Sequence, residues 1–396
     1  MLRALKYFFV SSFLLGSFAL ICQSLDESNG VSRLFYGRAF FMTNFFFLAS
    51  YLSCWLILQH DRMHSYLTHD NLPGIQKIHG ASVPRVGGLA LLFALLVGLP
   101  LLRQLFPGAR FIDLLEVLML SSLPVFLGGF MEDLLANIRV PVRLGLSFLS
   151  SSLFVVLSGA IVPTLNVQLL DQLLTAIPLG LSLFTVFAVA GVTHSFNLVD
   201  GLNGLASGVA VVINTAAMAT AYAVGDHSVV MLSLLLNATT LGFLVWNWPR
   251  GKIFLGDGGA YMLGFMTAAI LVLLVQRNPV VSAWLPLVLV GFPVFETLYS
   301  IYRRKHQTKK SPGAPDNLHM HQLVYRLVVN LRQDHYPWLI SSNSLTTLPI
   351  LLAAGLVSTL AVCFFADTRA LMVTFLVGVV LYVMVYRFLL ALSSRT

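Results

Sequence analysis

The chain has 396 residues, of which 57% are hydrophobic and only 10% are charged, and its mean hydropathy is +0.84. A soluble protein of this length needs more polar residues to cover its surface, so the composition excludes that class and predicts a membrane protein. The net charge of +8 does not indicate nucleic-acid binding, because basic residues of membrane proteins gather on cytoplasmic loops.

Apolar runs of roughly 20 residues, the length of a spanning helix, occur along the whole chain. They lie at about 7–23, 38–59, 86–102, 114–130, 142–162, 176–193, 204–224, 229–246, 258–275, 280–302, 337–364 and 369–391. They predict an all-α polytopic membrane protein with 11–12 transmembrane helices, forming a single domain over residues 1–396. Arg3 and Lys6 before the first run are also typical of a signal peptide, an alternative that we disfavour because no clear small-x-small cleavage site follows.

The distribution of basic residues predicts the orientation. With a cytoplasmic N-terminus, alternation of the runs leaves only six of the 24 Lys and Arg outside, as the positive-inside rule requires. These six are Arg33, Arg38, Arg103, Arg110, Arg277 and Arg369. The same alternation brings every polar motif described below to the cytoplasmic face, which predicts one active site there.

Asp257 lies among Gly256, Gly258 and Gly259, where a helix is expected to begin. Glycines let backbone amides approach a ligand closely, and a helix N-terminus favours anions. Mg²⁺ is typically held by one or two carboxylates together with phosphate oxygens and water. The pattern therefore predicts that Asp257 binds a metal that also contacts a diphosphate, with a simple helix N-cap as the alternative.

Asn197, Asp200 and Asn203 recur at three-residue spacing and would share one face of a helix. Amides and a carboxylate on one face are suited to a metal, a ribose or a sugar. Asn and Asp beside glycines also build turns, and small residues such as Gly204 and Gly208 also pack membrane helices.

Glu132 and Asp133 end an apolar run, and acidic groups in such positions are functional hypotheses by default. Adjacent carboxylates repel, so a cation would stabilise them, or one would stay protonated. Near a bound metal, one of them would orient or deprotonate a phosphate nucleophile. The alternative is a pair of solvated charges at the membrane surface.

Basic and imidazole side chains supply further candidates for phosphate and sugar contacts. They are Lys77, His79, Arg85, Arg303, Arg304, His319 and His321. For the lysine and the arginines the alternative is snorkelling or a positive-inside role. The single residue between the two later histidines suits zinc poorly, so we favour anion or sugar contacts for both.

Together these strings resemble the polyprenyl-phosphate N-acetylhexosamine-1-phosphate transferases, the membrane family that starts bacterial cell-wall and O-antigen lipid intermediates. The resemblance covers about residues 70–330, in the family's order. The matching strings lie at 77–88, at 132–133 with 143–144, and at 197–205, 242–247, 252–254, 256–259, 293–304 and 319–322. The 1–60 and 337–396 regions are additional expected transmembrane segments.

Three positions depart from the family pattern. Glu132 and Glu296 each stand where the family usually has Asp, which keeps the charge but lengthens the side chain, and Gln322 replaces a histidine. The triple-histidine pattern of the phospho-MurNAc-pentapeptide branch is absent, which favours the branch that initiates O-antigen, enterobacterial common antigen or teichoic acid.

The resemblance implies that undecaprenyl phosphate attacks a UDP-N-acetylhexosamine, giving a lipid diphosphosugar and UMP. It implies Mg²⁺ on Asp257 and Asn197, with Mn²⁺ as a substitute, and Asp133 at the lipid phosphate. Asp200 and Asn203 would position the nucleotide or sugar. The remaining contacts to phosphates and substrate are expected from Lys77, His79, Asn247, Arg303, Arg304, His319 and His321. The partners implied are both substrates and the lipid bilayer, without nucleic acid, and a homodimer is compatible with the family.

Two alternatives of other kinds stay open at this point. A twelve-helix secondary transporter would have the same helix count, but transporters place polar groups near the bilayer midplane, whereas here they gather at one surface. A member of the same family with altered catalysis is the second alternative, because of Glu132 and Gln322.

Overall fold

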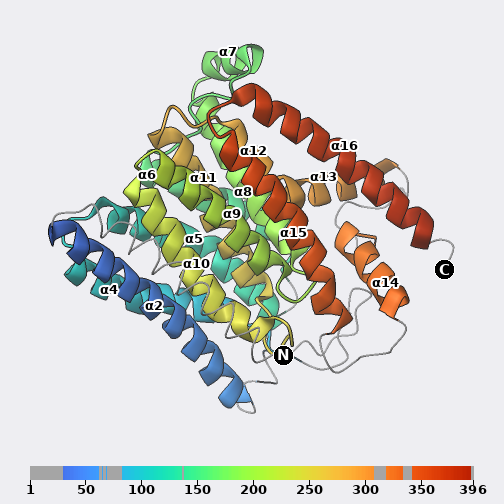
Figure 1. The fold of residues 1–396 in the computed structure, drawn as a ribbon, viewed down its shortest axis with the longest axis horizontal. Coiled ribbons are helices and arrows are strands. Elements are labelled where there is room, and N and C mark those ends of the chain that lie inside the picture. Colours follow the sequence, from blue (N-terminus) through green and yellow to red (C-terminus); the bar gives the residue numbers. More distant parts are fainter. Residues whose placement is uncertain are drawn as a thin grey trace.

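The described part of the chain is α-helical, as the computed structural model shows for residues 30–61, 65, 68, 83–135, 138–306, 318–332 and 341–393. Figure 1 shows a bundle of long helices that run side by side. The helices are α2 (Gly30–Gln59), α4 (Gly87–Leu105), α5 (Arg110–Leu135), α6 (Val140–Ser158), α7 (Gln168–Ala176), α8 (Gly180–Val199), α9 (Leu205–Ala223), α10 (His227–Asn247), α11 (Gly256–Arg277), α12 (Trp284–Leu289), α13 (Gly291–His306), α14 (Met320–Arg332), α15 (Ser342–Cys363) and α16 (Thr368–Ser393).

Ten of the helices in the described residues are long and apolar enough to cross a membrane, which confirms the predicted all-α polytopic membrane fold. Each corresponds to one of the predicted runs. The run at 7–23, with its signal-peptide alternative, lies outside the described residues.

The prediction of one continuous spanning helix over 280–302 was wrong. The chain there forms the short α12 and then α13, separated at Val290. Pro293 has no N–H to donate, and Gly291 disfavours helix continuation, so the sequence at the junction explains the break.

Helix α11 occupies the centre of the bundle. Every residue from Gly258 to Val275 is buried, and the helix packs against α4, α5, α8 and α9. Because α11 is apolar on all sides, its sequence suits a position surrounded by other helices.

Glycines let α11 approach its neighbours closely at the end where it begins. A Cβ on Gly129 of α5 would lie 2.5 Å from the backbone nitrogen of Gly258, and one on Gly88 of α4 would lie 2.5 Å from the Cα of Gly259. Real side chains do not tolerate such distances, so these glycines permit backbone-to-backbone packing. The close approach brings the C-terminal end of α5 beside the first turn of α11.

Polar contacts mark the other end of the bundle. The Arg277 guanidinium, at the end of α11, donates to the carboxylate of Asp226 at 2.7 Å. The Trp284 indole donates to the backbone carbonyl of Leu165 at 2.8 Å. Asp133 and Asp257 therefore lie at the opposite end of the bundle from these contacts.

We predict that Gly129→Ala lowers the free energy of unfolding by about 1–3 kcal/mol, because the added methyl group overlaps the α11 backbone. The measurement is thermal unfolding of the purified protein in detergent. Gly145→Ala on α6 is the matched control, since a Cβ there meets no atom within 4 Å. Equal midpoints for the two variants would contradict the close packing.

Candidate active site

Asp257 is held at the first turn of α11 by an unusual backbone conformation. Gly256 before it has φ +76°, a left-handed conformation that glycine adopts at little cost. A side chain at Gly256 would also collide with the Arg85 carbonyl oxygen and the Asp133 carboxylate. The glycine predicted to allow close approach at this position thus brings Asp257 beside groups from two other segments.

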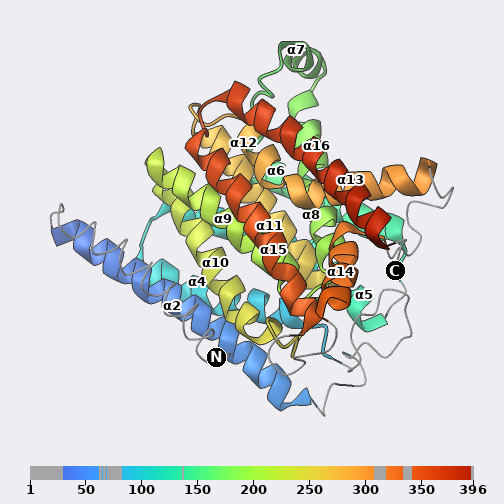
Figure 2. The ribbon, with the colours of Figure 1, turned by 45° about the vertical axis from the view of Figure 1, so that its right-hand side comes forward.

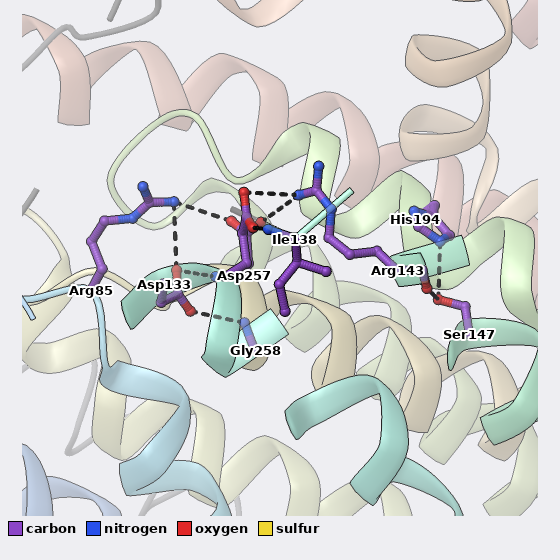
Figure 3. A network of polar contacts seen from close by, with 9 residues as sticks. Arg85, Asp133, Ile138, Arg143, Ser147, His194, Asp257 and Gly258 are labelled. Atoms are coloured by element: carbon purple, nitrogen blue, oxygen red, sulfur yellow. Dashed lines mark hydrogen bonds and ion pairs between the residues drawn. The ribbon is translucent and has the colours of Figure 1, made fainter. Parts of the chain in front are cut away.

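Asp133, from the end of α5, caps the N-terminus of α11. Its Oδ1 accepts the backbone N–H of Asp257 at 2.9 Å, and its Oδ2 accepts that of Gly258 at 3.1 Å. The side chain is 2% exposed, and Figure 3 shows it between α5 and the start of α11. A helix start leaves amide donors unpaired, and here a carboxylate from a neighbouring helix satisfies two of them.

Two arginines enclose the Asp257 carboxylate from opposite sides (Figure 3). Arg85 donates to Oδ1 at 3.1 Å and Arg143 donates to Oδ2 at 3.0 Å. Nη2 of Arg85 also lies 3.6 Å from Oδ1 of Asp133, and Nη1 of Arg143 lies 3.9 Å from Oε1 of Glu132. The site therefore combines carboxylates and guanidinium groups at one helix N-terminus, where an anion is favoured.

Glu132 has a structural partner of its own. Its Oε2 accepts the backbone N–H of Ile138 at 2.6 Å, so the longer side chain joins the end of α5 to the segment before α6. A role of Glu132 in proton handling stays a prediction.

Asp200 and Asn197 lie at the end of α8, and their side chains form no hydrogen bond with any residue that the structure describes. Burial raises the pKa of Asp200 well above its ordinary value, with Arg85 opposing this effect and Asp257 and Asp133 adding to it. Asp200 is thus within electrostatic range of the Asp257 network. Two polar side chains without protein partners beside such a network are suited to a ligand.

Asn203 and Asn247, both predicted to bind substrate, are used within the protein. Asn203 donates to the Ser344 hydroxyl at 3.1 Å, and its backbone N–H donates to Asn343 of α15 at 2.7 Å. Asn247 accepts the N–H of Gly204 and donates to the carbonyl of Ile253 at 2.8 Å. These bonds fix the loop after Asp200 against the segment leading to Asp257, and substrate contacts from either amide stay a prediction.

The predicted histidines and arginines gather around the start of α14. His319 and His321 are buried, as are Arg303 and Arg304. The Nη2 atom of Arg304 lies 3.3 Å from Nε2 of His319. Gln322, the departure from the family pattern, accepts the backbone N–H of His319 at 3.1 Å. This bond is half of a capping box, so glutamine has a structural role here. Lys77 and His79 lie outside the described residues.

The sequence assigned no site role to Arg143. It belongs to the string that follows the paired acids, which was the available signal, but its partner Asp257 lies 114 positions away in the chain. His194 was missed as well. Its Nε2 lies 3.0 Å from the Ser147 hydroxyl, one turn beyond Arg143 on α6, and its ring packs edge-on against Tyr261.

Comparisons with known proteins identify the class to which this arrangement belongs. The pattern of the family described as glycosyl transferase family 4 matches residues 115–275. A Bacillus subtilis (strain 168) protein named "probable undecaprenyl-phosphate N-acetylglucosaminyl 1-phosphate transferase" is 30% identical over 253 residues, which are 63% of this chain and 67% of that protein. The chain belongs to glycosyl transferase family 4.

Two other relatives are similar to the chain over slightly larger shares of its length. A Thermotoga maritima undecaprenyl-phosphate alpha-N-acetylglucosaminyl 1-phosphate transferase is 28% identical, covering 65% of this chain and 72% of that protein. The enzyme of the same name from Escherichia coli K12 is 25% identical, covering 66% and 70%. These findings confirm the predicted family and the predicted class of enzyme, a glycosyl-1-phosphate transferase, over the transporter alternative.

We predict that Asp200→Asn raises the thermal unfolding midpoint at pH 7, by about 2 °C or more. The pKa of Asp200 is raised in the folded state, so the folded protein holds the proton more tightly than the unfolded chain. Ionisation therefore opposes folding, and stability falls as pH rises from the ordinary Asp pKa of about 4 through the raised value.

The gain from Asp200→Asn should shrink as pH falls and disappear well below pH 4, where the carboxyl is protonated in both the folded and the unfolded state. Asp113→Asn, at an exposed position in the first turn of α5, is the control and should show no such gain. A midpoint for Asp200→Asn that is unchanged or lower at pH 7 would contradict the assignment of Asp200 as a destabilised carboxylate.

Proposed function

We propose that the protein transfers a sugar-1-phosphate from a UDP-N-acetylhexosamine to undecaprenyl phosphate, releasing UMP and initiating a cell-surface glycan. The named activity of its relatives supports this acceptor. The single observation that carries the proposal is the position of Asp257, at a helix N-terminus between Arg85 and Arg143. This arrangement suits a diphosphate, whose negative charge the two guanidinium groups would neutralise.

The two arginines are the groups that would bind the phosphates. Guanidinium groups match phosphate oxygens in geometry and retain their charge. With substrate bound, Arg85 and Arg143 would exchange their bonds to Asp257 for bonds to the diphosphate. This exchange holds the phosphorus atom in place and neutralises charge that develops on the departing UMP.

The residues present fit a Mg²⁺ ion that shares its ligands with the substrate. Among the described residues, no three His, Cys, Asp or Glu side chains lie close enough together to hold an ion by themselves. Mg²⁺ needs only one or two carboxylates when phosphates and water complete its shell. Asp257 would hold it, with Asn197 as the proposed second ligand, and the ion would neutralise the diphosphate.

Asp133 acts in this proposal by holding Asp257 in place beside the lipid phosphate. Both of its oxygens accept backbone N–H groups, so it is already engaged as a hydrogen-bond acceptor. A strong base is not needed, because an alkyl phosphate with a second pKa of about 6 is largely ionised at neutral pH.

The membrane fold suits substrates of opposite solubility. The polyprenyl tail would enter laterally from the bilayer, and the sugar nucleotide would arrive from water at the end of the bundle that carries Asp257. We propose that this end faces the cytoplasm of the bacterial inner membrane, on the basis of the positive-inside distribution of Lys and Arg.

We predict that Asp257→Asn lowers kcat/KM for UMP release by about 10²–10³-fold, because a charged group at the reacting diphosphate is lost. The assay combines purified protein, Mg²⁺, undecaprenyl phosphate and a panel of UDP-N-acetylsugars, with the lipid product identified by mass. EDTA should abolish the wild-type activity and added Mg²⁺ should restore it.

Asp226→Asn is the matched control, because Asp226 is also an aspartate at the start of a spanning helix and is bonded to an arginine. It lies at the other end of the bundle and should retain activity. Full activity of Asp257→Asn would remove this residue from the site. Wild-type protein without any lipid product would support a member with altered catalysis.

A further inference from the structure

A buried carboxylate joins three helices next to the proposed active site. Glu296 of α13 is 1% exposed. Its Oε2 accepts the hydroxyl of Tyr382 on α16 at 2.7 Å. Its Oε1 lies 3.2 Å from Nδ1 of His321 and 3.4 Å from Nδ1 of His319. The two oxygens thus face different partners, a tyrosine on one side and the histidines on the other.

His321 extends this contact to the loop that carries Asp200. A Cβ added to Gly201 would lie 2.7 Å from Nε2 of His321, so the imidazole packs directly against the backbone beside Asp200. The ring also stacks on that of His319, with centroids 5.4 Å apart and an interplanar angle of 8°. A continuous path of contacts therefore runs from Tyr382 through Glu296 and His321 to Gly201.

Helix α16 is placed to act on this loop although it lies beyond the matched region, 115–275. It packs against both α13 and α14 (Figure 2). A separate apolar cluster holds it there, formed by Met320, Leu323, Tyr382, Tyr386 and Leu389. The position of Tyr382 is therefore fixed independently of its hydroxyl group.

We propose that Tyr382 is a positioning residue of the transferase site, which acts through Glu296 and His321 to fix the Asp200–Gly201 loop. The length of the Glu296 side chain matters for this role, because its one carboxylate must reach both Tyr382 and the histidines. Aspartate at this position would be shorter by one methylene group and would not span both partners in the same backbone arrangement.

The effect follows from the proposed function, on which this inference rests. Asp200 is proposed to position the sugar nucleotide, so an unfixed loop should weaken donor binding and leave acceptor binding nearly unchanged. Loss of a hydrogen bond to a charged group should raise the donor KM about tenfold.

The test is a double-mutant cycle of Tyr382→Phe and Glu296→Asp, with donor and acceptor KM measured for each variant. Tyr382→Phe alone should raise the donor KM about tenfold. In the Glu296→Asp background it should add little, because the shortened carboxylate no longer reaches the hydroxyl. Tyr386→Phe is the matched control, since its hydroxyl donates to the Leu318 carbonyl instead, and its effect should multiply with that of Glu296→Asp.

Independent effects of Tyr382→Phe and Glu296→Asp would overturn the proposal, as would equal changes in donor and acceptor KM. A lower unfolding midpoint with unchanged kinetic constants would also overturn it, because Tyr382 would then be only structural. If Tyr382→Phe is not recovered folded, Glu296→Asp alone tests the proposal. A rise in the donor KM without a rise in the acceptor KM supports it, and equal changes in both overturn it. Wild-type protein run in parallel separates this outcome from failure of the proposed function, since that failure leaves no lipid product at all.

Discussion

The start of α11 is the constraint on which the site depends. A helix N-terminus inside a membrane protein leaves amide donors that cost free energy unless they find acceptors. Here the acceptor is Asp133 from α5, and glycines on both helices allow their backbones to approach closely enough for the bonds to form. The same geometry places Asp257 in the first turn of α11, between Arg85 and Arg143.

Several polar residues around the site, which belong to the strings that resemble the family, form hydrogen bonds within the protein. The side chains of Asn247 and Gln322 accept backbone N–H groups, and the side chain of Asn203 donates to the Ser344 hydroxyl. Such bonds hold the polar loops at the end of an apolar bundle, where water alone does not define one conformation. Within the part of the chain that the structure describes, the side chains of Asn197 and Asp200 form no hydrogen bond, which leaves them for a ligand.

The sequence predicted the helical fold and the convergence of its polar strings because both follow from local patterns. Apolar runs locate spanning helices, and motif order locates Asp133 and Asp257. It did not predict the break in the 280–302 run. The run is strongly apolar, which indicates one spanning helix, whereas Gly291 and Pro293 favour an interruption. The sequence also did not predict the Arg143–Asp257 ion pair or the Tyr382–Glu296 hydrogen bond. These contacts join residues that are 114 and 86 positions apart, and no local sequence pattern encodes them.

Cysteine labelling tests the central claim, that the segments beside Asp133 and before Asp257 meet at one end of the bundle. Single cysteines would replace the exposed Arg139, Lys252 and Gln172 in a protein lacking Cys22, Cys54 and Cys363. A membrane-impermeant thiol reagent would then be applied to intact cells and to inverted vesicles. The account predicts that positions 139 and 252 react from the same side and position 172 from the other. Reaction of positions 139 and 252 from opposite sides would contradict a shared site.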